Sequence, residues 1–276
     1  MSKSKPKFDS DGFQIISSKR SSRKLSKLTT RVTKFEKEEV EIDVDKTYRT
    51  ILFAAEDLKA SEYIKNVAKA VSNYLKQRKV VEIVCFGLGH IGESKTSQYQ
   101  LALLLSLKDI LKCDKVLVHD PIFYVSECDV LKMLQLDVIT ENQEGNYIIP
   151  SQDATLVYLP HCPKQLTNNF LWSNWGLTLK HCILLCNSFT SLIENHPSRT
   201  LIENAFYIYT IFPHTTEITL DNNFTYKDIF NDTSLHFFEE AKLNLLSPDF
   251  WLTNHKPQYD NTEEFITTLM VEKLNI

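Results

Sequence analysis

Short apolar, β-branched segments alternate with longer amphipathic segments through the middle of this chain, and this alternation limits its possible folds more than any other feature. The segments VVEIVCF (80–86) and KVLVH (115–119) are predicted strands, with a helix predicted between them over 93–112. Further strands are predicted at 136–140, 154–159, 181–186, 205–212 and 234–238. Such alternation is typical of a parallel sheet covered by helices on both faces. We therefore predict a Rossmann-like three-layer α/β sandwich with a mainly parallel sheet of about seven strands, and an antiparallel strand at one end would make it the methyltransferase variant.

The chain is predicted to consist of a polar tail followed by one domain. Residues 1–45 hold a Ser-, Lys- and Arg-rich run followed by an acidic stretch, and low hydrophobicity with high charge predicts disorder. The segment SSKRSSRKLSKL (17–28) fits either a solvated tail or a nuclear-import signal. Residues 46–276 are long enough to bury a single core, and their first helix is expected from about 55 to 78.

Composition and cysteine usage suggest the compartment. The longest aliphatic run, Leu101 to Leu105, is far short of the roughly 20 residues that a membrane helix needs. The six cysteines form no C-x-x-C pair, which favours free thiols in a reducing compartment. We expect a cytoplasmic protein, with the nucleus as a second location, no membrane partner and no strong sign of nucleic-acid binding.

The stretch VCFGLGHIGES (84–94) has the G-x-G-x-x-G spacing, with glycines at Gly87, Gly89 and Gly92 between a predicted strand and a predicted helix. In dinucleotide-binding loops these glycines allow a tight turn, the approach of a pyrophosphate and close helix–strand packing. Asp120 follows the next strand, where an acid binds ribose hydroxyls, and no packing role for it is evident. The loop is therefore either a cradle for a nucleotide-type ligand or a structural turn.

Polar residues also follow the fourth and fifth predicted strands, and the carboxyl ends of parallel strands share one edge of the sheet. His161 and Cys162 lie in the segment PHCP, and Asn187 follows HCILLC. His161 and Asn187 join the glycines and Asp120 as candidate cofactor-binding residues. Cys162, which precedes a proline, is a weak candidate for a thiolate ligand of haem, and the alternative is a rigid turn that lines a pocket. No catalytic acid–base group stands out.

Several segments in order resemble the motifs of the SRR1-like (sensitivity to red light reduced) family over about residues 80–240. They are VCFGLGHIGESKTSQYQLALLLSL, VHDPIF, NQEGNY, YLPHCPKQLTNNFLWSNW, LLCNSF and FNDTSLHFF. The resemblance implies a regulatory protein with signalling partners, whose plant members act in a light and circadian-clock input pathway, and it supplies no catalytic residues. The alternatives are a Rossmann-type enzyme, either an S-adenosylmethionine-dependent methyltransferase or NAD-linked, and a haem-responsive regulator.

Overall fold

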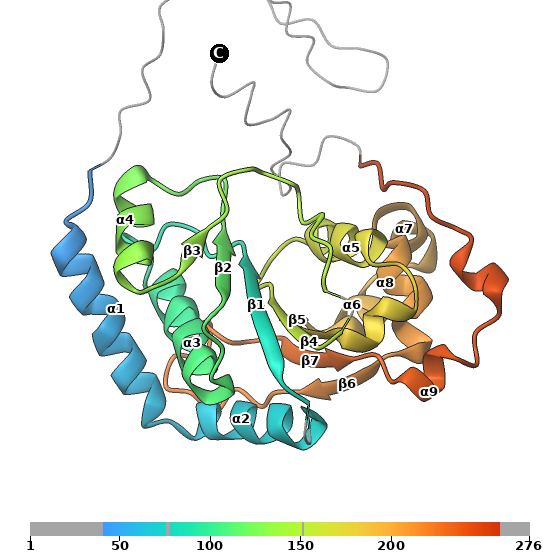
Figure 1. The fold of residues 1–276 in the computed structure, drawn as a ribbon, viewed down its shortest axis with the longest axis horizontal. Coiled ribbons are helices and arrows are strands. Elements are labelled where there is room, and N and C mark those ends of the chain that lie inside the picture. Colours follow the sequence, from blue (N-terminus) through green and yellow to red (C-terminus); the bar gives the residue numbers. More distant parts are fainter. Residues whose placement is uncertain (1–40, 76–77, 151, 260–276) are drawn as a thin grey trace, which may run out of the picture. The chain divides into compact units, whose positions relative to one another are not determined.

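The computed structural model describes residues 41–75, 78–150 and 152–259, which form a mixed α/β domain around one sheet (Figure 1). The tail at 1–40, including the basic run at 17–28, lies outside the described residues. Within the described residues, no helix combines the length and the apolar character that crossing a membrane requires.

The sheet has seven strands in the order β3-β2-β1-β4-β5-β7-β6. Strands β1 to β5 run parallel to one another, whereas β7 is antiparallel to both β5 and β6. The chain order reverses between β1 and β4, and in open α/β sheets such a switch point is where ligands bind. The strands are β1 (Val80–Phe86), β2 (Val116–His119), β3 (Asp137–Val138), β4 (Ala154–Tyr158), β5 (Cys182–Asn187), β6 (Thr216–Thr219) and β7 (Thr233–Phe237).

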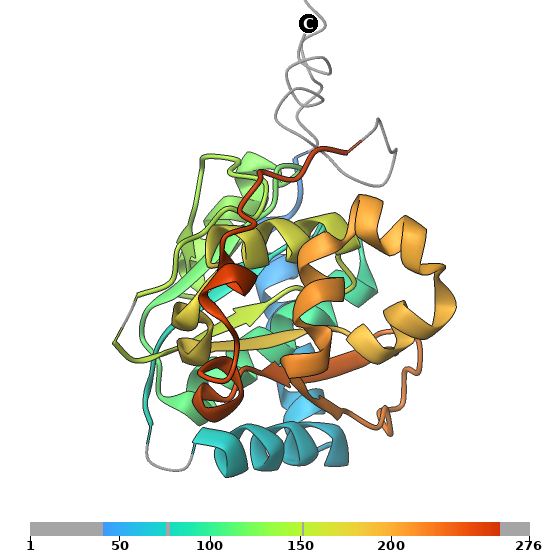
Figure 2. The same cartoon turned by 90° about the vertical axis from the view of Figure 1, so that its right-hand side faces the viewer.

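Helices cover both faces of the sheet, because successive strand residues point to opposite sides (Figures 1 and 2). Ile83 and Cys85 of β1 belong to one apolar core, and Val84 and Phe86 belong to the other. The first core includes α1 (Val44–Lys59), α2 (Glu62–Leu75), α3 (Lys95–Leu111) and α4 (Val125–Met133). The second includes α5 (Lys164–Ser173), α6 (Phe189–Asn195), α7 (Ser198–Asn204), α8 (Phe206–Ile211) and α9 (Glu240–Leu243).

Three short 3-10 helices complete the described elements. They are η1 (Leu177–His181), η2 (Phe212–His214) and η3 (Pro248–Trp251).

The central strands were predicted correctly, and β1 occupies the predicted residues 80–86. The prediction of a strand at 205–212 is wrong, since this aromatic and β-branched segment forms α8. The buried side chain of Asn168, from α5, accepts hydrogen bonds from the first N–H groups of α8, those of Tyr207 and Ile208, at 2.8 and 3.3 Å. This cap comes from a distant segment and overrides the local strand propensity. The sixth strand is Thr216–Thr219, which was missed because it is a polar strand at the edge of the sheet.

The helix expected from 55 to 78 is instead two helices, and the first begins inside the stretch assigned to the tail. Asp43 accepts a hydrogen bond from the Lys46 N–H at 2.9 Å and so caps α1. Ser61 separates the two helices, because its hydroxyl accepts from the Ile64 N–H at the start of α2. The signal for α1 was present in the sequence as apolar residues at helical spacing, namely Ile51, Ala54, Ala55 and Leu58.

We predict that Leu58→Ala destabilises the domain, because Leu58 is completely buried in the core formed by α1 and α3. The free energy of unfolding should fall by about 2–5 kcal/mol in urea denaturation. Phe53→Ala on the same helix is the control, since Phe53 is 72% exposed and its loss should change stability by less than about 0.5 kcal/mol. Equal effects of the two substitutions would mean that α1 does not pack as described.

Candidate functional site

A cavity of about 210 Å³ lies beyond the carboxyl ends of β1, β2 and β4, and five of the seven predicted site residues line it. They are Gly87, Gly89, Asp120, His161 and Cys162. Gly92 is not among the residues that line it, and Asn187 lines a neighbouring cavity instead. Sequence segments 30 to 75 residues apart are therefore brought together as the shared strand edge predicts.

The turn after β1 needs glycine at two positions. Gly87 and Gly89 have φ angles of +74° and +72°, in the left-handed region that other residues rarely adopt. A Cβ atom on Gly87 would lie 2.4 Å from the Cys162 sulfur. The turn after β1 and the turn after β4 are thus in direct contact.

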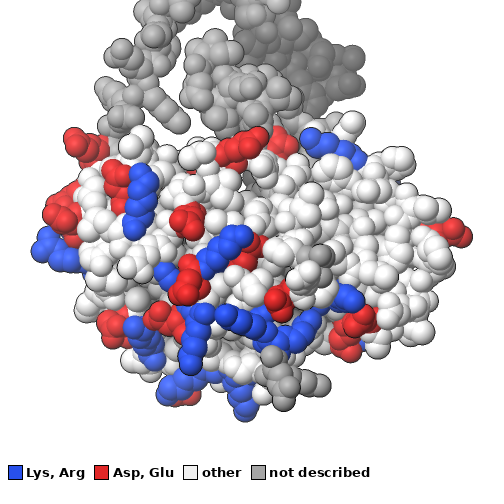
Figure 3. Space-filling model, viewed as in Figure 1, with Lys and Arg blue, Asp and Glu red and all other residues white. Residues whose placement is uncertain are grey.

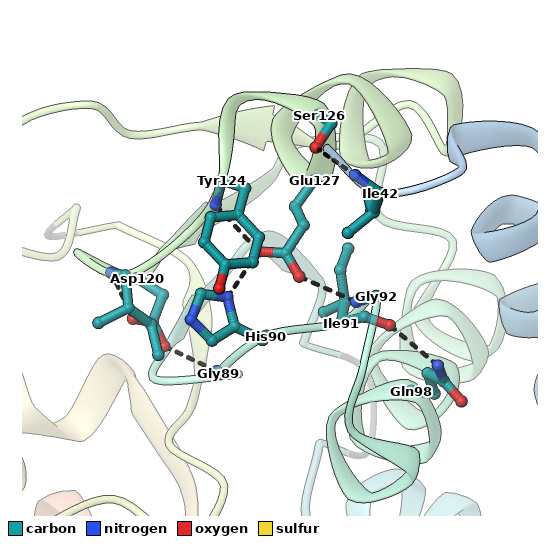
Figure 4. A network of polar contacts seen from close by, with 11 residues as sticks. Ile42, Gly89, His90, Ile91, Gly92, Gln98, Asp120, Tyr124, Ser126 and Glu127 are labelled. Carbon is teal, nitrogen blue, oxygen red and sulfur yellow. Dashed lines mark hydrogen bonds and ion pairs between the residues drawn. The ribbon is translucent and has the colours of Figure 1, made fainter. Parts of the chain in front are cut away.

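Asp120 stabilises this turn by hydrogen bonds. This finding differs from the expectation that Asp120 has no packing role. One carboxylate oxygen accepts a hydrogen bond from the Gly89 N–H at 2.7 Å, and the other accepts from the Ile122 N–H at 3.0 Å (Figure 4). Asp120 lines the cavity, but both of its carboxylate oxygens already accept hydrogen bonds from backbone N–H groups. The sequence could not show this, because the contact joins residues 31 positions apart.

Glu127 is a second carboxylate that binds the turn, and sequence reasoning did not assign it to the site. It is completely buried, and it accepts hydrogen bonds from the Gly92 N–H at 2.9 Å, the Tyr124 N–H at 2.9 Å and the His90 ring at 3.0 Å (Figure 4). The His90 ring also stacks on Tyr124. A Glu at the third position of a helix that binds the N-cap N–H is half of a capping box, a signal that the sequence did contain.

Gly92 has a different role from the one predicted. A Cβ atom there would lie 2.8 Å from Cγ2 of Ile42, which precedes α1, so the close approach is to that segment rather than to a strand. The Ile42 N–H in turn donates to the Ser126 hydroxyl at the start of α4. Gly92 therefore lies where the segment before α1, the glycine loop and the start of α4 meet.

The three glycine N–H groups are all bound within the protein. The Gly87 N–H donates to the His119 carbonyl, and those of Gly89 and Gly92 donate to Asp120 and Glu127. A phosphate cradle needs such groups to point at the ligand. In this structure two carboxylates accept the hydrogen bonds of the Gly89 and Gly92 N–H groups, so these groups are not available to a phosphate.

The segment PHCP forms a rigid turn whose groups also bond internally. The Cys162 thiol donates to the Phe86 carbonyl at 3.2 Å, and burial raises the pKa of this thiol. His161 has a φ of +49°, and its ring contacts the Asn231 carbonyl at 3.0 Å. The Asn187 amide donates to the Cys162 carbonyl at 3.2 Å. No group of three or more His, Cys, Asp or Glu side chains in the described part of the chain is placed to hold a metal ion.

His119 is a further residue of the site that was not predicted. It is 6% exposed and lines the cavity, and its Nδ1 contacts the Ile139 carbonyl at 2.8 Å. A carbonyl only accepts, so Nδ1 carries the proton and Nε2 of the neutral ring is an acceptor. Nε2 is buried and has no partner among the described residues. Buried polar atoms are nearly always paired, so this nitrogen indicates a missing hydrogen-bond donor.

Comparison with known proteins gives the family. The SRR1 domain matches residues 56–237. The chain is 30% identical over 230 residues to the SRR1-like protein of Drosophila melanogaster, covering 82% of this chain and 81% of that protein. It is 39% identical over 133 residues to the SRR1-like protein of Mus musculus, covering 46% and 52%.

A plant protein also matches. The chain is 26% identical over 213 residues to the Arabidopsis thaliana protein SENSITIVITY TO RED LIGHT REDUCED 1, covering 74% of this chain and 75% of that protein. Since the SRR1 domain spans more than half of the chain, the protein belongs to the SRR1 domain family. The predicted family is thus confirmed.

We predict that Gly87→Ala destabilises the protein by more than about 2 kcal/mol, through the left-handed backbone and the contact with Cys162. In a Cys162→Ala background the sulfur is gone, and only the backbone cost of about 1–2 kcal/mol should remain. A double-mutant cycle of urea unfolding energies should therefore show favourable coupling of at least about 1 kcal/mol. Additive energies would contradict the contact between the two turns.

Asp120→Asn should lower the free energy of unfolding by about 1–3 kcal/mol, because the amide NH₂ would face one of two backbone N–H donors. Asp114→Asn is the matched control: Asp114 is exposed just before the same strand, and its substitution should have almost no effect. Unchanged stability of both variants in urea denaturation would rule out the bracing role of Asp120.

Proposed function

We propose that this protein is a regulator that acts by binding a small ligand at the carboxyl edge of a Rossmann-like three-layer domain. Membership of the SRR1 family and the name of the Arabidopsis relative, which refers to sensitivity to red light, support a regulatory role. A place in a circadian-clock input pathway, protein partners in signalling and a cytoplasmic location, with the nucleus as a second, belong to the same proposal.

The observation that carries the ligand proposal is the buried, unpaired Nε2 of His119, a residue that lines the cavity of about 210 Å³. A ligand that donates a hydrogen bond to this nitrogen would satisfy it. A hydroxyl or an exocyclic amine, both present in adenosine, has the required donor. Asp120 stands where ribose hydroxyls bind in related folds.

Two features favour an adenosyl group over NAD. The glycine N–H groups are bound to His119, Asp120 and Glu127 and so are not available to a pyrophosphate. The cavity is also smaller than the roughly 300–1,000 Å³ of sites for drug-sized ligands, so one nucleoside suits it better than a dinucleotide.

A methyltransferase that uses S-adenosylmethionine is the second candidate function, and the strand order favours it. The antiparallel β7 lies between β5 and β6, as expected for the methyltransferase variant of the fold. S-adenosylmethionine contains an adenosyl group and no phosphate. If this candidate holds, the residues described here bind and orient the ligand, and none of them is assigned a catalytic role.

Haem binding through Cys162 is less well supported. A cysteine that ligates haem must lose its thiol proton and reach the iron. The Cys162 thiol is buried and donates to the Phe86 carbonyl, and burial raises its pKa.

Among the described residues, the distribution of charge does not suggest nucleic acid as a partner. Figure 3 shows Lys and Arg mixed with Asp and Glu towards the lower margin of this face. Lys115, which precedes β2, is paired with Glu82 at 2.5 Å, and Lys180, which lies within η1, is paired with Glu240 at 2.6 Å. Charges neutralised within the protein contribute little to phosphate binding.

The test is calorimetric titration of the full chain with adenosine, S-adenosylmethionine, S-adenosylhomocysteine and NAD. We expect binding of an adenosyl compound without a pyrophosphate, and loss of at least tenfold in affinity in Ile122→Phe, which fills the cavity. Ile148→Phe is the control, since Ile148 is 76% exposed and does not line the cavity. It should bind as the parent protein does.

Two results would contradict the proposal. One is the absence of binding for every adenosyl compound in the parent protein. The other is equal affinity of the parent and a folded Ile122→Phe variant, which would place the ligand elsewhere.

A further inference from the structure

A second cavity, of about 380 Å³, adjoins the first on the other side of the PHCP turn. Cys162 and Pro163 line both cavities, so this turn is the wall between them. The second cavity lies among α5, α6 and α8, beyond the carboxyl ends of β4 and β5. Its volume falls within the range of small-molecule sites.

The side chains that line this cavity are mainly hydrogen-bond donors. Lys164 supplies an ammonium group, Ser191 a hydroxyl, Asn195 an amide and His196 an imidazole. Among the described residues that line it, Asp232 is the only carboxylate, and it is exposed. A donor-rich lining with one lysine is chemically suited to an anion.

The orientation of His196 adds a nitrogen for a ligand. Its Nδ1 contacts the Leu192 carbonyl at 2.9 Å, so this nitrogen carries a proton and the bond fixes the ring. Nε2 is the ring nitrogen that this bond leaves unused.

Besides Asp232, a second negative charge near the cavity, that of Glu217, is partly compensated. Glu217 lies next to the start of α6, where one of its oxygens accepts from the Thr190 N–H and hydroxyl at 2.9 and 2.7 Å. Burial alone would raise the pKa of Glu217, but hydrogen bonds from His236, Ser188 and Thr190 lower it, so the group is a carboxylate. Donors of the protein thus contact one oxygen of this carboxylate, and the His236 ring lies 3.6 Å from the other.

We propose that the cavity between α5 and α6 binds a phosphate-bearing small molecule, with Lys164 as the main charged contact. The proposal goes beyond the adenosyl site and does not depend on it. Lys164 is also the first residue of α5, so the positive end of the helix dipole adds to its charge. The phosphate belongs either to a separate metabolite or to a nucleoside phosphate whose base occupies the first cavity.

The test is titration of the full chain with inorganic phosphate at constant ionic strength, followed by calorimetry. We expect Lys164→Gln to weaken phosphate binding at least about tenfold, as expected for a lost charge-assisted hydrogen bond, at an unchanged melting temperature. Lys69→Gln, which removes the same charge from an exposed site on α2, is the matched control and should bind as the parent does. Equal binding by Lys164→Gln, or equal weakening by Lys69→Gln, would overturn the proposal.

Adenosine 5′-monophosphate and adenosine distinguish the two sources of phosphate. If one molecule spans both cavities, the monophosphate binds more tightly than adenosine, and Lys164→Gln removes that advantage. If the phosphate belongs to a second molecule, inorganic phosphate binds equally well to protein saturated with adenosine. Ile122→Phe should weaken only the adenosine titration, so this proposal and the proposed function can fail separately.

Discussion

The candidate site depends on two carboxylates from a neighbouring segment, which fix the glycine turn by accepting hydrogen bonds from its N–H groups. Asp120 binds the Gly89 N–H and Glu127 binds the Gly92 N–H, and both acids belong to the segment that runs from β2 into α4 (Figure 4). A carboxylate that accepts from backbone N–H groups forms a charge-assisted hydrogen bond, roughly twice as strong as a neutral one. Since Glu127 is completely buried, removing its donors would leave a charge without compensation, and the loop is therefore fixed.

Because of these hydrogen bonds, the G-x-G-x-x-G spacing does not indicate a phosphate-binding loop in this protein as it does in dinucleotide-binding proteins. In dinucleotide-binding loops the same spacing leaves N–H groups for a pyrophosphate, and the ligand supplies the negative charge. Here the protein supplies that charge itself. A phosphate that displaced Asp120 from Gly89 would first have to break a hydrogen bond of about 1.5–3 kcal/mol and would then lie beside a carboxylate. The glycine spacing and the left-handed turn are present, but the N–H groups of Gly89 and Gly92 are bonded within the protein.

The parts that the sequence predicted are those determined by local pattern. The buried strands β1, β2, β4 and β5 are short apolar runs. The prediction failed where contacts with distant segments of the chain determine the local structure. The strand expected at 205–212 is a helix capped by Asn168, some 40 residues earlier in the chain. The first helix was expected from about residue 55, but α1 begins at Val44, inside the last residues assigned to the tail.

The same distinction applies to the site. The rule that strand ends share an edge was enough to bring Gly87, Asp120 and Cys162 together, but it could not show which polar atoms are already paired. Asp120 appeared available in the sequence and is bound in the structure, whereas His119, which was not predicted, carries an unpaired nitrogen. Pairing depends on contacts between residues 20 to 37 positions apart, and these exist only once the sheet has formed.

The PHCP turn connects the two cavities physically. Its Cys162 touches Gly87 so closely that a methyl group on the glycine would overlap the sulfur, and its main chain is bound to Asn187 at the end of β5. A ligand that moves this turn from one side must therefore alter the wall of the other cavity, because close-packed contacts transmit displacement. Under the two binding proposals above, ligands in the two cavities would therefore influence each other's affinity through this shared wall.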